Sequence, residues 1–149
     1  MRRGLFIAAL AATACTPLTF SNTAPIDFER YRSVYVEGAE GGGIDINLAG
    51  LSPREYLIEG LREDSGFRRV ERGPGDVDVH LRVSLFIDLD RGFDREDDEY
   101  TVTADFELYT PDGTLVDRGS VYDEDEDLYE AVEDALDEVV HHYLPSYRL

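Results

Sequence analysis

The sequence has one cysteine, no tryptophan and no lysine, so all fourteen of its basic residues are arginines. A single cysteine cannot form a disulfide within the chain, and packing alone must therefore hold the fold together. The chain also lacks an apolar run of about 20 residues, the length that a helix needs to cross a bilayer. Its 33 acidic residues outnumber the arginines and give a net charge of −19. We therefore do not expect binding to nucleic acid or anionic lipid, since both require positive surface patches.

The first fifteen residues have the anatomy of an export signal. Arg2 and Arg3 form a basic start, residues 4–10 form a short apolar core, and residues 11–14 are small. Cys15, the only cysteine, follows directly. This arrangement is typical of a secretory signal, and the apolar core is too short to remain as a membrane span. The sequence thus predicts a signal peptide over residues 1–14.

The residues before the cleavage point, Ala12-Thr13-Ala14-Cys15, resemble the lipobox of bacterial lipoproteins, which signal peptidase II cuts before the cysteine. This resemblance implies a diacylglycerol on the sulfur of Cys15 and a fatty acid on its new amino group. Several acyl chains would give stable anchoring. Thr16, in place of an aspartate after the cysteine, implies the outer membrane. The commonest lipobox has leucine where Ala12 stands, and an ordinary secreted protein with a cysteine near its cleavage site is the alternative.

Three segments are expected in the chain. Residues 1–14 are the lipoprotein signal peptide, residues 15–27 are the lipidated cysteine and a flexible tether, and residues 28–149 form a single α+β domain. The tether is rich in Ser, Thr, Asn and Pro and has no periodicity, which is typical of a linker. The mature chain of 149 − 14 = 135 residues has the length of one domain.

Two helices are expected. Ser52, Pro53 and Glu55 make a strong helix start, because serine can cap, proline fits the first turn and glutamate completes a capping box. Gly66 is placed to end that helix. The second helix, over residues 128–143, has an apolar stripe at three- and four-residue spacing and an acidic run at its positive dipole end.

Alternating apolar and polar residues predict the strands. Residues 77–90 alternate strictly, which indicates one long strand with one buried and one wet face. Shorter strands are expected over residues 33–37, 67–71, 100–109 and 114–122, with a loop at 38–50. We therefore expect an α+β fold, a two-layer sandwich in which two amphipathic helices pack on one face of a mainly antiparallel sheet of about five strands.

Carboxylates near the turn at residues 91–99 are weak candidates for a cation site, since Ca²⁺ takes several carboxylate oxygens. They are Asp88, Asp90, Asp94, Asp97 and Asp98. The preferred interpretation is a solvated hairpin tip in a very acidic protein. His80 is expected on the wet face of the sheet, and the adjacent His141 and His142 are expected at an exposed helix end, because neighbours on a helix cannot face one metal together. Neither a metal nor a cofactor is predicted.

No motif for catalysis is found: no Gly-x-Ser-x-Gly elbow exists, and acylation would consume the only thiol. The mature part resembles small α+β envelope lipoproteins that begin with Asp-Phe-x-x-Tyr-x-x-Val-x-Val, here residues 27–36, and its end, Tyr143-Leu144-Pro145-Ser146, looks like that of the lipopolysaccharide-assembly lipoprotein. The strong acidity departs from that last family, whose lipopolysaccharide handling would be expected to use basic residues.

These observations predict a non-enzymatic envelope lipoprotein, held at the outer membrane by acyl chains and acting as an interaction or assembly accessory for an envelope protein partner. A lipid-tethered ligand- or cation-binding module in the periplasm is the alternative. The expected interaction surface is the polar sheet face around His80, Arg82, Phe86 and Tyr109.

Overall fold

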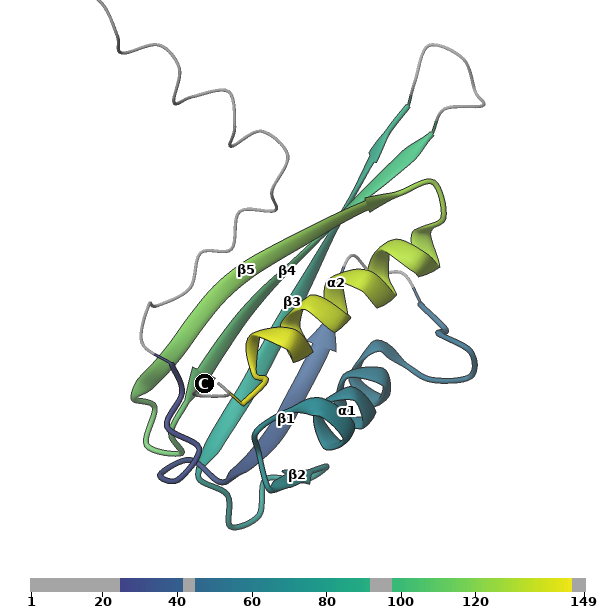
Figure 1. The fold of residues 1–149 in the computed structure, drawn as a ribbon. Coiled ribbons are helices and arrows are strands. Elements are labelled where there is room, and N and C mark those ends of the chain that lie inside the picture. Colours follow the sequence, from purple (N-terminus) through teal and green to yellow (C-terminus); the bar gives the residue numbers. More distant parts are fainter. Residues whose placement is uncertain (1–24, 42–44, 92–97, 146–149) are drawn as a thin grey trace, which may run out of the picture.

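The computed structural model describes residues 25–41, 45–91 and 98–145. Along the chain the elements are β1 (Ser33–Glu40), α1 (Pro53–Asp64), β2 (Arg69–Glu71), β3 (Val79–Asp90), β4 (Glu99–Tyr109), β5 (Leu115–Asp125) and α2 (Leu128–His142). Both helices lie on one face of the sheet, and the hairpin of β3 and β4 extends past their ends (Figure 1). The expected two-layer α+β architecture is confirmed.

The five strands form an open sheet in the order β2-β1-β3-β4-β5. β1 runs parallel to both of its neighbours, whereas β3–β4 and β4–β5 are antiparallel. The parallel pairing of β1 and β2 follows from α1, which carries the chain back to the end of the sheet where β1 started. The sheet is therefore mixed, and its antiparallel pairings are the longest ones.

Local sequence explains where the helices begin. The hydroxyl of Ser52 accepts a hydrogen bond from the backbone N–H of Glu55 (3.2 Å), and Pro53 occupies the first turn. Asp127 caps α2 by accepting from the N–H groups of Tyr129 and Glu130. Near the middle of α1, Gly60 lies so close to α2 that an added Cβ would come within 2.9 Å of Val140. The two helices can therefore pack closely against each other as well as on the sheet.

The core lies between the helices and the inward face of the sheet. Every second residue of β3 from Val79 to Leu85 is buried, as the strict alternation predicts. The largest fully buried side chains include Tyr143, Phe106, Leu48, Leu57, Ile58, Leu61, Leu81, Leu85, Leu108 and Leu136.

Three expectations need correction. The last strand, expected over residues 114–122, runs from Leu115 to Asp125, so the first three residues of the acidic run pair with β4 instead of leading into the helix. The first strand does not stop at Glu37 but runs to Glu40, with an irregularity in its register between Val36 and Gly38. The bulge lets the chain keep pairing with β3 through Ala39, which is buried against the core. His142 is not exposed at the helix end: its side chain is 17% exposed and contacts a buried carboxylate.

Candidate functional site

The sheet face opposite the helices carries a row of rings across three strands. The cross-strand registers pair Tyr35 with His80 and His80 with Tyr109. The ring centroids are 5.2 Å apart for the first pair and 5.6 Å for the second. Val34, Val79 and Leu108 are buried against the helices, and successive residues of a strand point to opposite faces. The neighbouring Tyr35, His80 and Tyr109 therefore point to the open face.

Glu37 and Arg82 lie beside these rings on the same face. We call the five residues together the open-face cluster: Tyr35, Glu37, His80, Arg82 and Tyr109. The Nε of Arg82 donates to one oxygen of Glu37 (3.1 Å), and Nδ1 of His80 lies 3.3 Å from the other. The Nη2 of Arg82 donates to the hydroxyl of Tyr109 (3.2 Å), and its guanidinium stands 5.4 Å from the centroid of that ring. The carboxylate thus holds the arginine and the histidine in fixed positions.

Partial burial shapes the electrostatics of the cluster. Burial alone would raise the pKa of Glu37, but its contacts with Tyr109, His80 and Arg82 outweigh that effect and hold the pKa below its ordinary value. Burial and the neighbouring Glu37 raise the pKa of the Tyr109 hydroxyl. At neutral pH the cluster therefore contains an ionised Glu37, a charged Arg82 and a protonated tyrosine hydroxyl.

The four residues expected to form an interaction surface are only partly brought together. His80, Arg82 and Tyr109 are in contact, whereas Phe86 lies four residues further along β3, about 13 Å from Arg82. Phe86 is 57% exposed on the same face. Glu37 and Tyr35 were missed by sequence reasoning, because the contact between β1 and β3 depends on parallel pairing between segments about 45 residues apart.

The expected cation site receives no support from the described residues. Asp88 and Asp90 are exposed near the end of β3, and Asp98 is half-buried before β4. Asp94 and Asp97 lie outside the described residues, as does the expected lipidation site Cys15. Within the part of the chain that the structure describes, no three His, Cys, Asp or Glu side chains are grouped so that they could hold a metal ion.

A buried polar group on the opposite face was also missed. Asp117 on β5 is 1% exposed, and its Oδ2 lies 2.7 Å from Nε2 of His142 on α2. Its Oδ1 and the hydroxyl of Tyr143 are both buried, and neither has a hydrogen-bond partner among the residues that the structure describes. Burial, with the nearby Asp117, raises the pKa of Tyr143 well above its ordinary value. Asp117 lies four residues before Val121 on the same strand, so period-two alternation places both side chains on one face. That alternation could have indicated that Asp117 faces inward with Val121.

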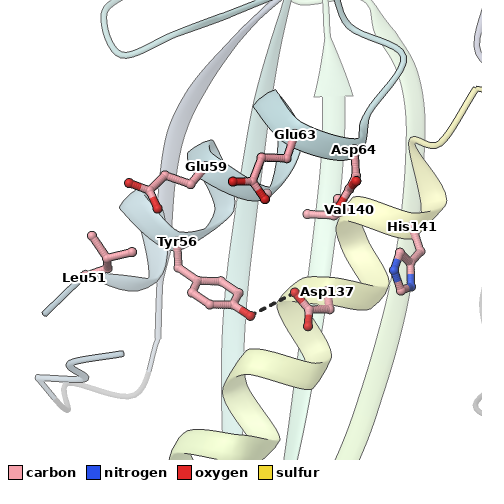
Figure 2. A pocket seen from close by; sticks show the side chains of 9 residues that line it. Leu51, Tyr56, Glu59, Glu63, Asp64, Asp137, Val140 and His141 are labelled. Atoms are coloured by element: carbon pink, nitrogen blue, oxygen red, sulfur yellow. Dashed lines mark hydrogen bonds between the residues drawn. The ribbon is translucent and has the colours of Figure 1, made fainter. Parts of the chain in front are cut away.

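A small acidic groove of about 240 Å³ lies between the helices (Figure 2). Its carboxylates are Glu59, Glu63 and Asp64 of α1 and Asp137 of α2. The hydroxyl of Tyr56 donates to Asp137 (3.0 Å) across the groove. Burial and this carboxylate together raise the pKa of Tyr56 far above its ordinary value. The tyrosine therefore stays protonated and links the two helices.

No helix in the described part of the chain is long and apolar enough to cross a membrane. No family model matches the sequence, and no curated protein matches it. Solved structures do match. PelC from Paraburkholderia phytofirmans, described as a dodecamer, aligns with a TM-score of 0.62 at 16% identity over 86% of this chain and 99% of PelC.

A leucine-to-methionine variant of the same PelC dodecamer gives a TM-score of 0.63 at 17% identity, covering 88% of this chain and 99% of that one. Protein XCC0632 from Xanthomonas campestris, described as family DUF330, gives 0.50 at 13% identity, covering 78% and 84%. The likeness is one of fold. At these identities it establishes the shared arrangement of strands and helices across nearly the whole of PelC, and nothing about activity.

Proposed function

We propose that this protein is a lipid-anchored, non-enzymatic accessory of the outer membrane, facing the periplasm, and that its open-face cluster binds an envelope protein partner. The leader and Cys15 support the anchoring. The shared fold supports an assembly role, since PelC, which has that fold, is described as a dodecamer. The proposal depends most on one observation: an ordered, partly buried group of charges and rings on a sheet face that no described helix covers (Figure 1).

The open-face cluster favours binding because its side chains are already held in place by their contacts with one another. A partner that meets flexible side chains must fix them on binding, and this costs about 0.5–1.5 kcal/mol for each long side chain. Here Glu37 already fixes Arg82, whose side chain is nonetheless 57% exposed. Tyrosine and arginine are also among the residues that are enriched in binding hot spots. The cluster therefore offers a partner prearranged groups for hydrogen bonding and ring contact.

A catalytic role for the same cluster is not supported. A histidine–carboxylate pair can activate a nucleophile when the histidine also contacts a hydroxyl or thiol. Among the described residues, the only side-chain hydrogen bond of His80 is the one with Glu37. Arg82 contacts the same carboxylate, and Tyr109 contacts Arg82. Neither is placed as a nucleophile beside His80.

Affinity capture of the tagged, full-length protein from gently solubilised membranes tests this proposal. Wild type is compared with Arg82→Glu, with Cys15→Ala and with Arg91→Glu, a matched charge reversal at an exposed site beyond the end of β3. We expect a stoichiometric envelope partner that Arg82→Glu loses and Arg91→Glu keeps, with weaker capture by Cys15→Ala. Equal capture by a folded Arg82→Glu variant would exclude the cluster as the binding surface.

A ligand- or cation-binding module is the second candidate, favoured by the acidic groove between α1 and α2. Four carboxylates from two helices line that groove and give it negative charge, but among the described residues no three of them are grouped so that they could hold one metal ion. A ligand that binds only the folded state raises the melting temperature by mass action. Thermal melts with and without millimolar Ca²⁺ therefore distinguish the candidates, and an unchanged melting temperature would reject calcium binding.

A further inference from the structure

Phe86 lies on the open face of the sheet but outside the open-face cluster. Its side chain is 57% exposed, more than any other large apolar side chain in the described part of the chain. It is about 13 Å from Arg82 along β3. Here β3 and β4 extend past the ends of both helices (Figure 1). One exposed apolar side chain is ordinary on a protein surface, so its meaning depends on what surrounds it.

The cross-strand registers place Phe86 in a row of three side chains. Phe86 of β3 is opposite Thr103 of β4, and Thr103 is opposite Tyr122 of β5. Thr103 and Tyr122 are both half-buried. Their strand neighbours Val102 and Val121 are buried against the helices, so alternation places the row on the open face. Two rings and a hydroxyl therefore form a strip across three strands.

Carboxylates flank this strip on both sides. Asp105 lies on β4, two residues beyond Thr103, on the side toward the open-face cluster. On the other side, Asp88 and Glu124 are both opposite Thr101 of β4, one on each neighbouring strand. All three carboxylates are exposed. We call the strip and its carboxylates together the Phe86 surface: Phe86, Asp88, Thr103, Asp105, Tyr122 and Glu124.

This half of the open face is short of positive charge. None of the three carboxylates takes part in an ion pair among the described residues. In the described rows from Ser84 to Asp90 of β3, no basic side chain lies on this face. Asp90 is directly opposite Glu99, and like charges in that position repel each other. Residues 88–99 as a whole contain seven acidic residues and two arginines.

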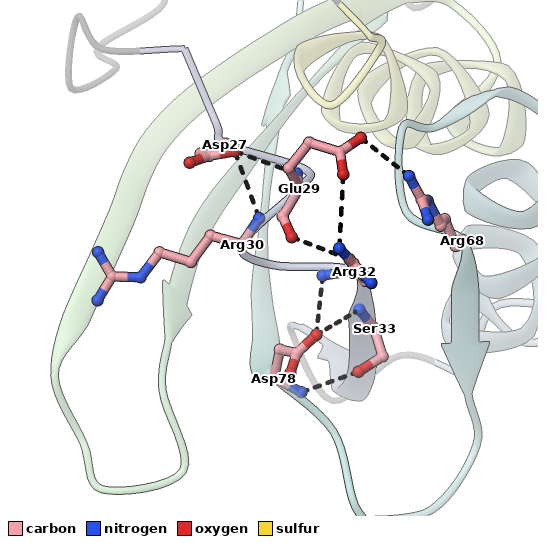
Figure 3. Close-up of polar contacts among 7 residues, drawn as sticks. All are labelled: Asp27, Glu29, Arg30, Arg32, Ser33, Arg68 and Asp78. Atoms are coloured by element: carbon pink, nitrogen blue, oxygen red, sulfur yellow. Dashed lines mark hydrogen bonds and ion pairs between the residues drawn. The ribbon is translucent and has the colours of Figure 1, made fainter.

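Arginines at the other end of the sheet already have partners. Arg32 and Arg68 both contact Glu29 just before β1 begins, at 3.5 Å and 2.9 Å (Figure 3). β1 begins beside the start of β3, so these two arginines lie far along the strands from Phe86. Arg82 is held by the carboxylate of the open-face cluster. A cation for the Phe86 surface is therefore best supplied by another molecule.

The chemistry of the surface indicates what kind of cation it fits. A guanidinium or ammonium group binds over the face of an aromatic ring and also pairs with carboxylates. Residues two apart on a strand are about 7 Å apart, so a cation over Phe86 is within reach of Asp88. No three carboxylates among the described residues are grouped for a metal ion. Charges spread along a strip suit a chain segment with several basic side chains.

We infer that the Phe86 surface binds a basic segment of a partner protein, whose arginine or lysine side chains pack on Phe86 and pair with the flanking carboxylates. The inference goes beyond the proposed function, since it uses neither the lipid anchor nor the open-face cluster. The attraction is between exposed charges, so binding weakens as salt shortens the Debye length from about 10 Å at 0.1 M to about 3 Å at 1 M.

Fluorescence anisotropy tests this inference with the purified full-length protein in detergent. The probe is a short fluorescein-labelled peptide of alternating arginine and glycine, and a second peptide has glutamine in place of arginine. Wild type should bind the first peptide and not the second. Phe86→Ala should weaken binding about threefold, because the contact between cation and ring is lost. Asp88→Asn with Glu124→Gln should weaken it about fivefold, because two ion pairs are lost.

Two matched variants separate this surface from the net charge of the chain. Tyr129→Ala removes another ring, 50% exposed in an acidic stretch of α2. Glu59→Gln with Glu63→Gln removes two carboxylates from the groove between the helices. Both should bind the arginine peptide as wild type does, and urea unfolding checks that every variant keeps its fold.

Equal weakening in the matched variants would overturn the inference, because the peptide would then follow net charge alone. A wild type that does not bind the arginine peptide would also overturn it. The assay needs no envelope partner, so its failure is distinguishable from a failure of the affinity capture that tests the open-face cluster.

Discussion

Each face of the sheet has a histidine beside a carboxylate. The two histidines are almost equally buried, at 17% exposed for His142 and 15% for His80, and the pairs differ in their carboxylates. His142 lies 2.7 Å from Asp117 on the covered face, where the carboxylate is 1% exposed. His80 lies 3.3 Å from Glu37 on the open face, where the carboxylate is 26% exposed and also bound by Arg82. Burial of the Asp117 carboxylate therefore makes the first pair part of the fold. The partly exposed Glu37 carboxylate, which Arg82 also contacts, leaves the second pair within reach of a partner.

The sharpest test of this contrast uses one residue type on both faces. Phe106 on β4 is 1% exposed beneath α2, whereas Phe86 on β3 is 57% exposed on the open face. We expect Phe106→Ala to lower the free energy of unfolding by about 3–5 kcal/mol, because a buried ring leaves a cavity. Phe86→Ala should change it by about 0.5 kcal/mol or less. Urea unfolding measures both, and equal losses would contradict the assignment of the faces.

The next largest effect on the free energy of unfolding is expected at the buried pair of His142 and Asp117. His142→Ala removes the one side-chain hydrogen bond that the buried Asp117 carboxylate makes among the described residues, so we expect a loss of about 3 kcal/mol in the free energy of unfolding. The adjacent His141 is exposed and provides a matched control, since His141→Ala should cost about 0.5 kcal/mol or less. Similar midpoints for the two variants in urea would show that the buried contact contributes nothing.

Asp123 lies close to other carboxylates and has no basic partner among the described residues. Removing its charge should therefore stabilise the fold, whereas breaking the contact of Asp117 should destabilise it. The pKa of Asp123 is about 6 in the folded state because of burial and Asp134, above its ordinary value of 3.8. A raised carboxyl pKa means that ionisation destabilises the fold, fully above about pH 6 and not at all below about pH 4. Asp123→Asn should therefore stabilise the protein at pH 8, by about 1 kcal/mol or less after screening, and not at pH 4. Thermal melts at the two pH values check the sign.

The open-face pair should have the smallest effect on stability. A double-mutant cycle with Glu37→Gln and Arg82→Ala should give a coupling of about 0.2–1 kcal/mol, reduced by salt. The pKa of Glu37 is lowered in the fold, so its contribution is present above its ordinary value of 4.5 and is lost as the pH falls through the folded value. A coupling as large as the loss in His142→Ala would break the distinction between the two faces.

Sequence patterns predicted most of the strands and helices, but they did not predict which strands lie side by side. The alternation of residues 77–90 located β3 and its buried face, and the Ser52-Pro53 start placed α1 correctly. The parallel position of β1 between β2 and β3 has no local signal, because it is set by the path of the chain through α1. For the same reason, His80, Arg82 and Tyr109 could be assigned to the open face, whereas their contacts with Glu37 could not.

Residue periodicity and turn chemistry by themselves determined which segments become strands and helices, which side of each is apolar, and that the two layers must bury those sides together. These are local properties, fixed by geometry that repeats every 2 or 3.6 residues. Only the tertiary structure decided which residues from distant segments meet. It joined Asp117 to His142 and gathered the open-face cluster around Glu37, because strand order is set by how the whole chain closes its core.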